Sequence, residues 1–360
     1  MTSGKAETES DVPVASDENP KKATPSAKED KPSEAGSKEL NSKAETSTEE
    51  IKSKYEVPFP VVCPGHSRPV VDVRYSSETE DGVFLISACH DKLPMVRWAD
   101  NGDWIGTLSG HKGAVWSACM NQDATRAATG AADFTVKLWN CISGVELCTF
   151  DHKHIVKSVE ISKDGSKLLT GGLDKTLRIY DLQSAADQAP PLVSLDANAK
   201  ISKVSWLNDN TNIAVCGTDD GHIRKWDTRS GEFVTELKAL DVALTDMEVL
   251  PDIGRLICSG GKSIKLYDSE TLDLIHSVDA ANAVEAVSLH PNGKRFICGG
   301  ADLWVHEYEI SETSTEIACH KGHHGPIFCI AYHPDGKTYA SGSEDGTIRL
   351  WTASDKSVQN

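Results

Sequence analysis

The stretch GHKGAVWSACMNQDATRAATGAADFTVKLW, residues 110–139, decides the fold. It contains an alternating apolar run, a polar turn, a second apolar run that ends in small residues, a tight turn, and a third run that ends in an aromatic residue. Alternation of apolar and polar residues over several positions is typical of half-buried β-strands. The stretch therefore predicts three consecutive strands joined by short turns.

The same unit recurs along most of the chain. Successive third runs end in aromatic residues that are 41, 41, 46, 41, 41 and 43 residues apart. A period of about 40–45 residues is typical of the four-stranded blades of a propeller. The sequence therefore predicts an all-β fold, a seven-bladed propeller. The aromatic residues that mark the seven blades are Trp98, Trp139, Tyr180, Trp226, Tyr267, Tyr308 and Trp351.

The ends of the repeat region predict how the ring closes. Only nine residues follow Trp351, too few to supply the outer strand of the last blade. The segment EVPFPVVC, residues 56–63, has the character of a strand that tolerates proline at a sheet edge. We expect it to pair with the last blade, because closure removes an exposed sheet edge. The predicted propeller domain is residues 55–360.

Residues 1–54 have a different composition. They contain no aromatic residue and few large aliphatic ones, and they are rich in Ser, Thr, Ala, Pro, Glu and Lys. Such a segment cannot bury enough apolar surface to offset the entropy of ordering, so we predict a disordered acidic and polar tail. It is interpreted either as a solubility spacer or as a docking arm that is phosphorylated.

Charge and motif content exclude several classes of function. The net charge of −17 argues against binding of nucleic acid or anionic lipid by the chain as a whole. No apolar run approaches the ~18 residues of a membrane span, and no secretory signal is expected. Ten cysteines without C-x-x-C spacing indicate a reducing, intracellular compartment. Four of them, Cys89, Cys216, Cys258 and Cys298, close apolar runs in a common setting and are interpreted as small hydrophobic residues.

Histidines and aspartates recur at fixed spacing in several units. Gly-His pairs stand at residues 65–66, 110–111 and 322–323, and three histidines precede a turn aspartate by 22 residues. With these motifs the chain resembles the WD-repeat family, in which a histidine, a strand Ser or Thr, a turn aspartate and a strand aromatic form a buried hydrogen-bonded set. The resemblance implies three sets: His111, Thr129, Asp133 and Trp139; His152, Thr170, Asp174 and Tyr180; and His323, Ser341, Asp345 and Trp351.

These sets predict a structural role and not catalysis. A nucleophile needs an activating base and an oxyanion site in one cleft, whereas a set repeated in several blades serves to hold strands together. The sequence also lacks a phosphate-binding loop and zinc-type ligand spacing. We therefore expect no catalytic residue, no metal ligand and no cofactor.

Function is expected on the turns and faces of the propeller, because its strands are committed to packing. Large or charged residues stand at turn tips where most WD repeats have glycine, and two aromatic residues occupy matching places in opening strands. We predict that these residues bind a partner: Phe134, Lys175, Leu303, Trp304, Trp116 and Phe328. The alternative for the two tryptophans is that they fill gaps between blades, and Trp104 is expected to pack in this way.

Longer segments resemble one branch of the WD-repeat family, the most specific of them residues 102–139, 152–182 and 322–351. The resemblance implies a non-enzymatic scaffold of the survival-of-motor-neuron complex in spliceosomal snRNP assembly, with a link to receptor-kinase signalling of the TGF-β type. Implied partners are Gemin-type subunits, an unr-type RNA-binding protein and receptor kinases, with RNA contacted only indirectly. We expect a monomeric chain within a larger complex, in the cytoplasm, with a nuclear location left open. Alternatives are the propeller subunit of translation initiation factor three and a generic WD-repeat adaptor.

Overall fold

The computed structural model describes residues 59–184, 187–208, 211–312 and 314–354. The chain divides into two units, residues 1–57 and 58–360, and all described residues belong to the second. The tail predicted at residues 1–54 lies outside them. The described residues form 28 strands and one 3-10 helix, η1 (Pro251–Ile253).

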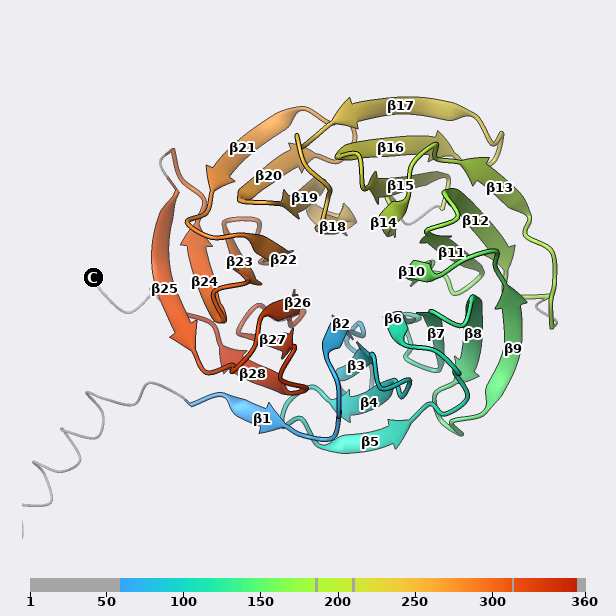
Figure 1. The fold of residues 1–360 in the computed structure, drawn as a ribbon, viewed down its shortest axis with the longest axis horizontal. Coiled ribbons are helices and arrows are strands. Elements are labelled where there is room, and N and C mark those ends of the chain that lie inside the picture. The colour runs from blue at the N-terminus through green and yellow to red at the C-terminus, as the bar shows by residue number, and fades with distance from the viewer. Residues whose placement is uncertain (1–58, 185–186, 209–210, 313, 355–360) are drawn as a thin grey trace, which may run out of the picture. The chain divides into compact units, whose positions relative to one another are not determined.

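The strands form seven four-stranded sheets arranged as the blades of a ring (Figure 1), as the repeat predicts. Within each sheet the strands are antiparallel, and the first strand lies nearest the axis. Blade one contains β2 (Val70–Tyr75), β3 (Phe84–Cys89), β4 (Met95–Trp98) and β5 (Trp104–Thr107); blade two β6 (Val115–Met120), β7 (Arg126–Ala131), β8 (Thr135–Asn140) and β9 (Glu146–Asp151); blade three β10 (Val156–Ile161), β11 (Lys167–Gly172), β12 (Thr176–Asp181) and β13 (Val193–Asp196); blade four β14 (Ile201–Trp206), β15 (Ile213–Thr218), β16 (His222–Asp227) and β17 (Phe233–Lys238); blade five β18 (Asp246–Leu250), β19 (Arg255–Gly260), β20 (Ser263–Asp268) and β21 (Leu274–Asp279); blade six β22 (Val284–Leu289), β23 (Arg295–Gly300), β24 (Trp304–Glu309) and β25 (Thr315–Lys321); blade seven β26 (Ile327–Tyr332), β27 (Thr338–Ser343), β28 (Ile348–Thr352) and β1 (Val61–Cys63).

Blade seven is built from both ends of the repeat region. β1 pairs antiparallel with β28, with Cys63 opposite Ile348, and the two strands lie side by side in Figure 1. Of the segment 56–63, residues 56–58 lie outside the described residues, and β1 covers Val61–Cys63 of the remainder. Pro60 and Pro64 flank it, and proline has no N–H with which to continue a ladder. The outer strand of the last blade is therefore supplied from the N-terminal side.

The second strand of every blade is its most buried strand. All seven begin with a half-buried residue and bury the next five. Small residues near their ends allow the next blade to come close: a Cβ atom on Gly130 would lie 2.8 Å from Val156 Cγ1. The fourth strands, such as β17, are largely exposed. Burial thus decreases from the inner strands of a blade to its rim.

The hydrophobic core lies between neighbouring blades. In one apolar cluster, residues of blade two pack against residues of blade three, and the Phe150 and Tyr180 rings lie 4.5 Å apart between their centroids. Burial of apolar area contributes about 25 cal/mol per Å². Each blade therefore depends on its neighbours for stability, as is general in repeat architectures.

Hydrogen bonds from backbone N–H groups to side-chain oxygens also join successive blades. In four blades, a side chain of the opening strand accepts a hydrogen bond from the backbone N–H of the fourth residue in the next blade's opening strand. The acceptor is the third residue of β2, β6 and β10 and the first residue of the shorter β18. The pairs are Asp72 with Ala118 (3.2 Å), Ser117 with Val159 (3.2 Å), Ser158 with Val204 (3.1 Å) and Asp246 with Val287 (3.0 Å). These buried bonds fix the blades relative to one another around the axis.

Two sequence predictions about blade one are wrong. The strand register places Arg97, not Trp98, where blade two has Trp139, because Arg97 lies opposite Leu85 as Trp139 lies opposite Ala127. The Trp98 ring instead packs on Phe84, with ring centroids 4.8 Å apart. Trp104 is 60% exposed at the start of the outer strand β5 and does not fill a gap between blades.

Candidate functional site

Blades two and seven each contain a complete hydrogen-bonded set. His111 Nδ1 lies 2.9 Å from Asp133 Oδ2, and its Nε2 lies 2.7 Å from Thr129 Oγ1. Trp139 Nε1 donates to the same Thr129 oxygen at 2.8 Å. In blade seven His323, Ser341, Asp345 and Trp351 repeat this arrangement with distances of 2.7–3.0 Å.

The turn aspartates of these sets are held in the ionised form. Burial opposes ionisation of Asp133, but hydrogen bonds from His111 and Thr135 outweigh it and hold its pKa well below the usual range. Asp345 has its pKa lowered to about 2, because backbone and side-chain hydrogen bonds from the neighbouring turn again outweigh burial. Each aspartate therefore links the turn between strands two and three to the loop that enters the blade.

Blade three departs from the predicted set. His152 Nε2 lies 2.9 Å from Thr170 Oγ1, but its Nδ1 faces the carbonyl oxygen of Phe150 at 3.3 Å. Asp174 forms an ion pair with Arg178, with 2.7 Å between Oδ2 and Nη1. Lys137 holds the corresponding position in blade two and binds the Glu146 carboxylate on the outer strand β9. Arg178 lies opposite Ser194 on the outer strand of blade three, and serine offers no carboxylate.

Asp174 pairs with Arg178, so the His152 ring nitrogens face Thr170 and the Phe150 carbonyl oxygen and not Asp174. Burial, assisted by Arg178, lowers the pKa of His152 to about 4. Tyr180 packs against His152, with 5.8 Å between the two ring centroids. The sequence prediction of a four-residue set is therefore not matched in this blade.

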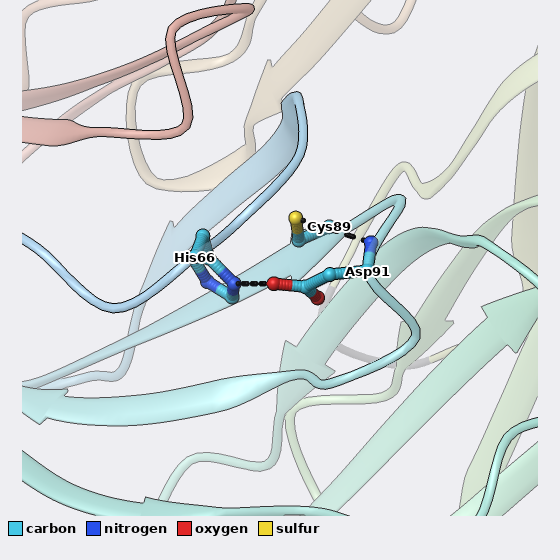
Figure 2. Close-up of side chains that lie close together, drawn as sticks. All are labelled: His66, Cys89 and Asp91. Atoms are coloured by element: carbon cyan, nitrogen blue, oxygen red, sulfur yellow. Dashed lines mark hydrogen bonds and ion pairs between the residues drawn. The ribbon is translucent and has the colours of Figure 1, made fainter.

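Blade one contains a set that the spacing did not reveal. His66 Nδ1 lies 2.9 Å from Asp91 Oδ2, and its Nε2 lies 2.8 Å from Ser87 Oγ. Figure 2 shows the His66 ring facing the Asp91 carboxylate, with the Cys89 sulfur beside them. The Gly65–His66 pair was the signal, but 25 residues separate this histidine from its aspartate instead of 22.

Cysteines replace the central hydroxyl in blades four to six. Cys216, Cys258 and Cys298 are each the fourth residue of the second strand of their blade, the place of Thr129 in blade two. Burial raises the pKa of the Cys258 thiol to about 12, so it stays neutral and packs as a small apolar group. Cys89 does not share this place, since it lies opposite Val70, two residues farther along its strand.

The predicted partner-binding residues at the turn tips adopt a left-handed backbone. Phe134, Lys175 and Leu303 have φ of 68°, 64° and 71°, whereas Gly221 and Gly346 have 77° and 75° at corresponding turns. Positive φ is unfavourable for residues other than glycine. Strained positions of this kind are concentrated at functional sites.

Side-chain exposure distinguishes these residues. Phe134 is 43% exposed, and its ring centroid lies 5.4 Å from that of His154. Lys175 is exposed and Leu303 is half-buried. Trp304 is 39% exposed and carries the Lys321 ammonium 3.8 Å above its ring, so it does not fill a gap between blades.

Trp116 and Phe328 come together at one mouth of the central channel. This cavity of about 350 Å³ is lined by the second residue of the opening strand in six blades, with neighbouring residues such as His90 and Lys203. These six residues are Val71, Trp116, Lys157, Ser202, Glu285 and Phe328, and blade five contributes Thr245, which directly precedes β18. Lys157 Nζ lies 3.1 Å from the Trp116 ring centroid, and burial lowers its pKa to about 8.

A charged network inside the channel was missed by the sequence reasoning. A second cavity of about 490 Å³ is lined by the third and fifth residues of several opening strands. Lys203 forms ion pairs with Asp246 at 3.1 Å and with Asp72 at 3.6 Å. The signal was a pair of charged residues in an otherwise apolar strand, as in VVDVRY or LTDMEV, because charges buried in this way require partners.

Two groups bring three metal-type ligand atoms within 4.8 Å of one another among the described residues: His66, Cys89 and Asp91, and His306, Glu316 and Cys319. In the first, both ring nitrogens of His66 already belong to the structural set. Among the described residues no helix has the length and apolar character needed to cross a membrane.

The seven-bladed ring and its His-Ser/Thr-Asp-Trp sets define a WD-repeat propeller, the class of protein whose rigid disc serves as a scaffold. The family model for the WD domain, G-beta repeat, matches residues 97–140, 144–181, 190–227 and 314–352. Residues 228–313, which contain blade five and the first three strands of blade six, lie outside that match.

Comparison with known proteins identifies the family more closely. The Serine-threonine kinase receptor-associated proteins of Gallus gallus and Homo sapiens are 49% and 46% identical over 294 residues, covering 81% of this chain and 82% of each relative. The Eukaryotic translation initiation factor 3 subunit I of Drosophila pseudoobscura pseudoobscura is 31% identical over 321 residues and is covered to 96%. The chain belongs to the family of serine-threonine kinase receptor-associated proteins.

Proposed function

We propose that this scaffold is a non-enzymatic subunit of the survival-of-motor-neuron complex and acts in spliceosomal snRNP assembly. The observation that carries the proposal is the identity of 46–49% over 294 residues to serine-threonine kinase receptor-associated proteins. The name of these relatives supports a second role, association with a serine-threonine kinase receptor, and we propose that this receptor is of the TGF-β type. In both roles the chain contributes binding surface and no chemical step.

The proposed partner surface consists of the turn tips Phe134 and Lys175 together with the channel mouth at Trp116 and Phe328. Phe134 and Lys175 occupy the same turn in adjacent blades, so one extended partner can contact both. Exposed aromatic residues on a rigid surface lose little conformational entropy on binding and are frequent hot spots of interfaces. The strained backbone at both tips presents these side chains to solvent.

The proposed partners are Gemin-type subunits, an unr-type RNA-binding protein and receptor kinases, with RNA contacted through them. The chain itself is proposed to be monomeric within the complex and cytoplasmic, with a nuclear location left open. Protein partners suit a molecule of net charge −17, which would repel a phosphate backbone.

The test is affinity capture of the tagged full-length chain from native extract, with partners identified by mass spectrometry. We expect recovery of Sm-assembly subunits, and at least tenfold less of them with Phe134→Ala. The matched control is Ile142→Ala, which removes an apolar side chain that is 83% exposed at a different turn. Absence of Sm-assembly subunits from the wild-type capture would refute the proposed function.

The second candidate function is that of a translation initiation factor three subunit. It is favoured by the 31% identity over 321 residues to subunit I of that factor. Sedimentation of the extract separates the two candidates, because initiation complexes move with small ribosomal subunits. Co-sedimentation of the chain with those complexes would establish the second function in place of the first.

A further inference from the structure

Blade six carries a cluster of metal-ligand side chains on its outer two strands. His306 on β24 and Cys319 on β25 are direct cross-strand partners. The pairing shifts register between Glu307 and Tyr308, which places Glu316 opposite Tyr308. His306 and Tyr308 are two residues apart and share a face of the sheet, so the histidine, the carboxylate and the thiol converge.

The ligand atoms of these three residues lie within 4.8 Å of one another. His306 Nδ1 is 3.0 Å from Glu316 Oε1. Around a tetrahedral Zn²⁺ with bonds of 2.0–2.2 Å, a nitrogen and an oxygen ligand are separated by about 3.3 Å. A small rotation of the exposed Glu316 and Cys319 side chains is therefore enough to place all three atoms around one ion.

The second ring nitrogen of His306 is already oriented. Nε2 lies 2.7 Å from Asp302 Oδ2, and Asn282 Nδ2 donates to the same oxygen at 3.1 Å. A carboxylate that holds the far nitrogen of a histidine fixes its tautomer and directs the near nitrogen toward the metal. Asp302 is thus a positioning residue that leaves Nδ1 free to bind an ion once its proton is released.

The charges around His306 favour a cation. Two carboxylates face one imidazole, and the nearby Lys321 ammonium is engaged over the Trp304 ring at 3.8 Å. Without a metal, this arrangement is satisfied by a protonated His306 that donates to both carboxylates. A divalent ion in place of the Nδ1 proton preserves the same contacts and also uses the Cys319 sulfur.

We propose that His306 Nδ1, a Glu316 carboxylate oxygen and Cys319 Sγ form a binding site for Zn²⁺. The mixture of nitrogen, oxygen and sulfur ligands suits a borderline-soft ion and disfavours Mg²⁺ or Ca²⁺. Binding releases the thiol proton and the Nδ1 proton, with no change of oxidation state. Three protein ligands leave a fourth position for water, and the ion joins β24 to the rim strand β25.

The other triad, His66, Cys89 and Asp91, contrasts with this site. There the Cys89 thiol donates to the carbonyl oxygen of Arg68 at 3.1 Å, and Asp91 is bound by His66 and by the backbone N–H of Ser67 and Leu93. An ion would have to break the set that holds blade one. An ion in the blade six site breaks no such hydrogen-bonded set, since Glu316 and Cys319 are exposed.

Cobalt titration of the full-length chain tests the proposal, because thiolate-bound Co²⁺ has a charge-transfer band in the near ultraviolet. The first 54 residues contain neither histidine nor cysteine, so they add no competing ligand of this kind. We expect one Co²⁺ per chain with this band, displaced by Zn²⁺. Cys319→Ser removes the band, and His306→Gln and Glu316→Gln weaken binding at least tenfold. Asp302→Asn weakens it by about tenfold.

The matched control is Cys141→Ser, which replaces a half-buried thiol in blade two and leaves the band unchanged. Zn²⁺ raises the Tm of the wild type and not that of Cys319→Ser, whose exposed position allows the chain to fold. A wild-type chain without the band, or a band equally strong in Cys319→Ser, would overturn the proposal and leave the cluster as a hydrogen-bonded ion triad only. These outcomes are independent of the partner captured from extract.

Discussion

Three residues at the turn tips have a backbone conformation that is unfavourable for their residue type. Phe134, Lys175 and Leu303 have φ between 64° and 71°, where glycine is favoured. The left-handed conformation costs about 1–2 kcal/mol per residue other than glycine. Phe134 combines this backbone with a side chain that is 43% exposed, and for that reason it is the central residue of the proposed partner surface.

Leu303→Gly is predicted to stabilise the propeller. Glycine relieves the strain at φ of 71°, and the half-buried leucine loses only part of its packing. We expect the free energy of unfolding to rise by about 0.5–1 kcal/mol, measured by chemical denaturation. Gly346→Ala is the converse control, because its φ is 75° and an added Cβ would lie 3.1 Å from the His66 carbonyl oxygen, so it is destabilising. A lower stability of Leu303→Gly would show that leucine packing exceeds the strain.

Asp345→Asn is predicted to destabilise blade seven by about 1–3 kcal/mol, since it weakens hydrogen bonds from His323 and from the entering loop. The pKa of Asp345 is about 2 in the folded protein and about 3.9 in an unfolded chain. Its contribution is therefore complete above pH ~4 and is lost as the pH falls toward 2. Urea unfolding at pH 7 and pH 3 measures both effects.

The free energies of unfolding of Asp345→Asn and the wild type should differ less at pH 3 than at pH 7. Asp273→Asn is the control, because this aspartate is exposed at a rim turn. An equal difference at both pH values would mean that the lost interaction does not depend on ionisation of Asp345.

At the scale of elements, the closing strand is the weakest point of the ring by length. β1 has three residues, whereas the outer strand β25 of blade six has seven. β1 nevertheless covers the edge of β28, and Cys63 is buried in a cluster with Leu350 and Val70. Without β1, blade seven would expose a sheet edge and an apolar patch.

Removal of residues 1–63 is predicted to cause aggregation or loss of cooperative unfolding, because it deletes β1. Removal of residues 1–54 is the matched control, since it leaves β1 in place. Calorimetry and size-exclusion chromatography compare the two truncated chains with the full chain. If the longer truncation melts like the shorter one, the closing strand is dispensable for the ring.

At the scale of the whole molecule, the period of the sequence predicts the number of blades, but it does not predict which residues line the central channel. The His111–Asp133 spacing is readable because one unbroken hairpin separates the two residues. The His66–Asp91 pair escapes a fixed-spacing search because the connecting segment is longer. Trp98 was mistaken for a blade aromatic because only the strand register shows that Arg97 takes that place.

The residues that line the channel depend on a β-bulge in the opening strands, which the alternation of apolar and polar residues does not predict. In six blades the register shifts between the first and third residues of the opening strand. The extra residue of such a bulge breaks the strict alternation of side chains between the two faces of the strand. Strict alternation would place Trp116 and Ser117 on opposite faces, so neither the mouth nor the charged interior could be derived from the pattern alone.

The charged channel predicts a dependence of stability on pH that belongs to the whole ring. Burial raises the pKa of Glu248 to about 7, although it accepts a hydrogen bond from the Leu289 N–H at 2.7 Å. An unfolded glutamate has a pKa of about 4.3. Between these values the folded state binds the extra proton, so the contribution of Glu248 to stability falls as the pH rises from about 4.3 to 7.

Glu248→Gln is predicted to remove the decrease in stability that Glu248 causes as the pH rises. The amide stays neutral, and its oxygen can still accept a hydrogen bond from the Leu289 N–H. The difference in Tm between variant and wild type should therefore increase in favour of the variant from pH 5 to pH 8. Groups that titrate in both proteins cancel in this difference. Glu312→Gln is the control, because that side chain is exposed in the loop between β24 and β25. A difference that does not change with pH would mean that Glu248 is ionised throughout and is balanced within the channel by Arg74 and Lys203.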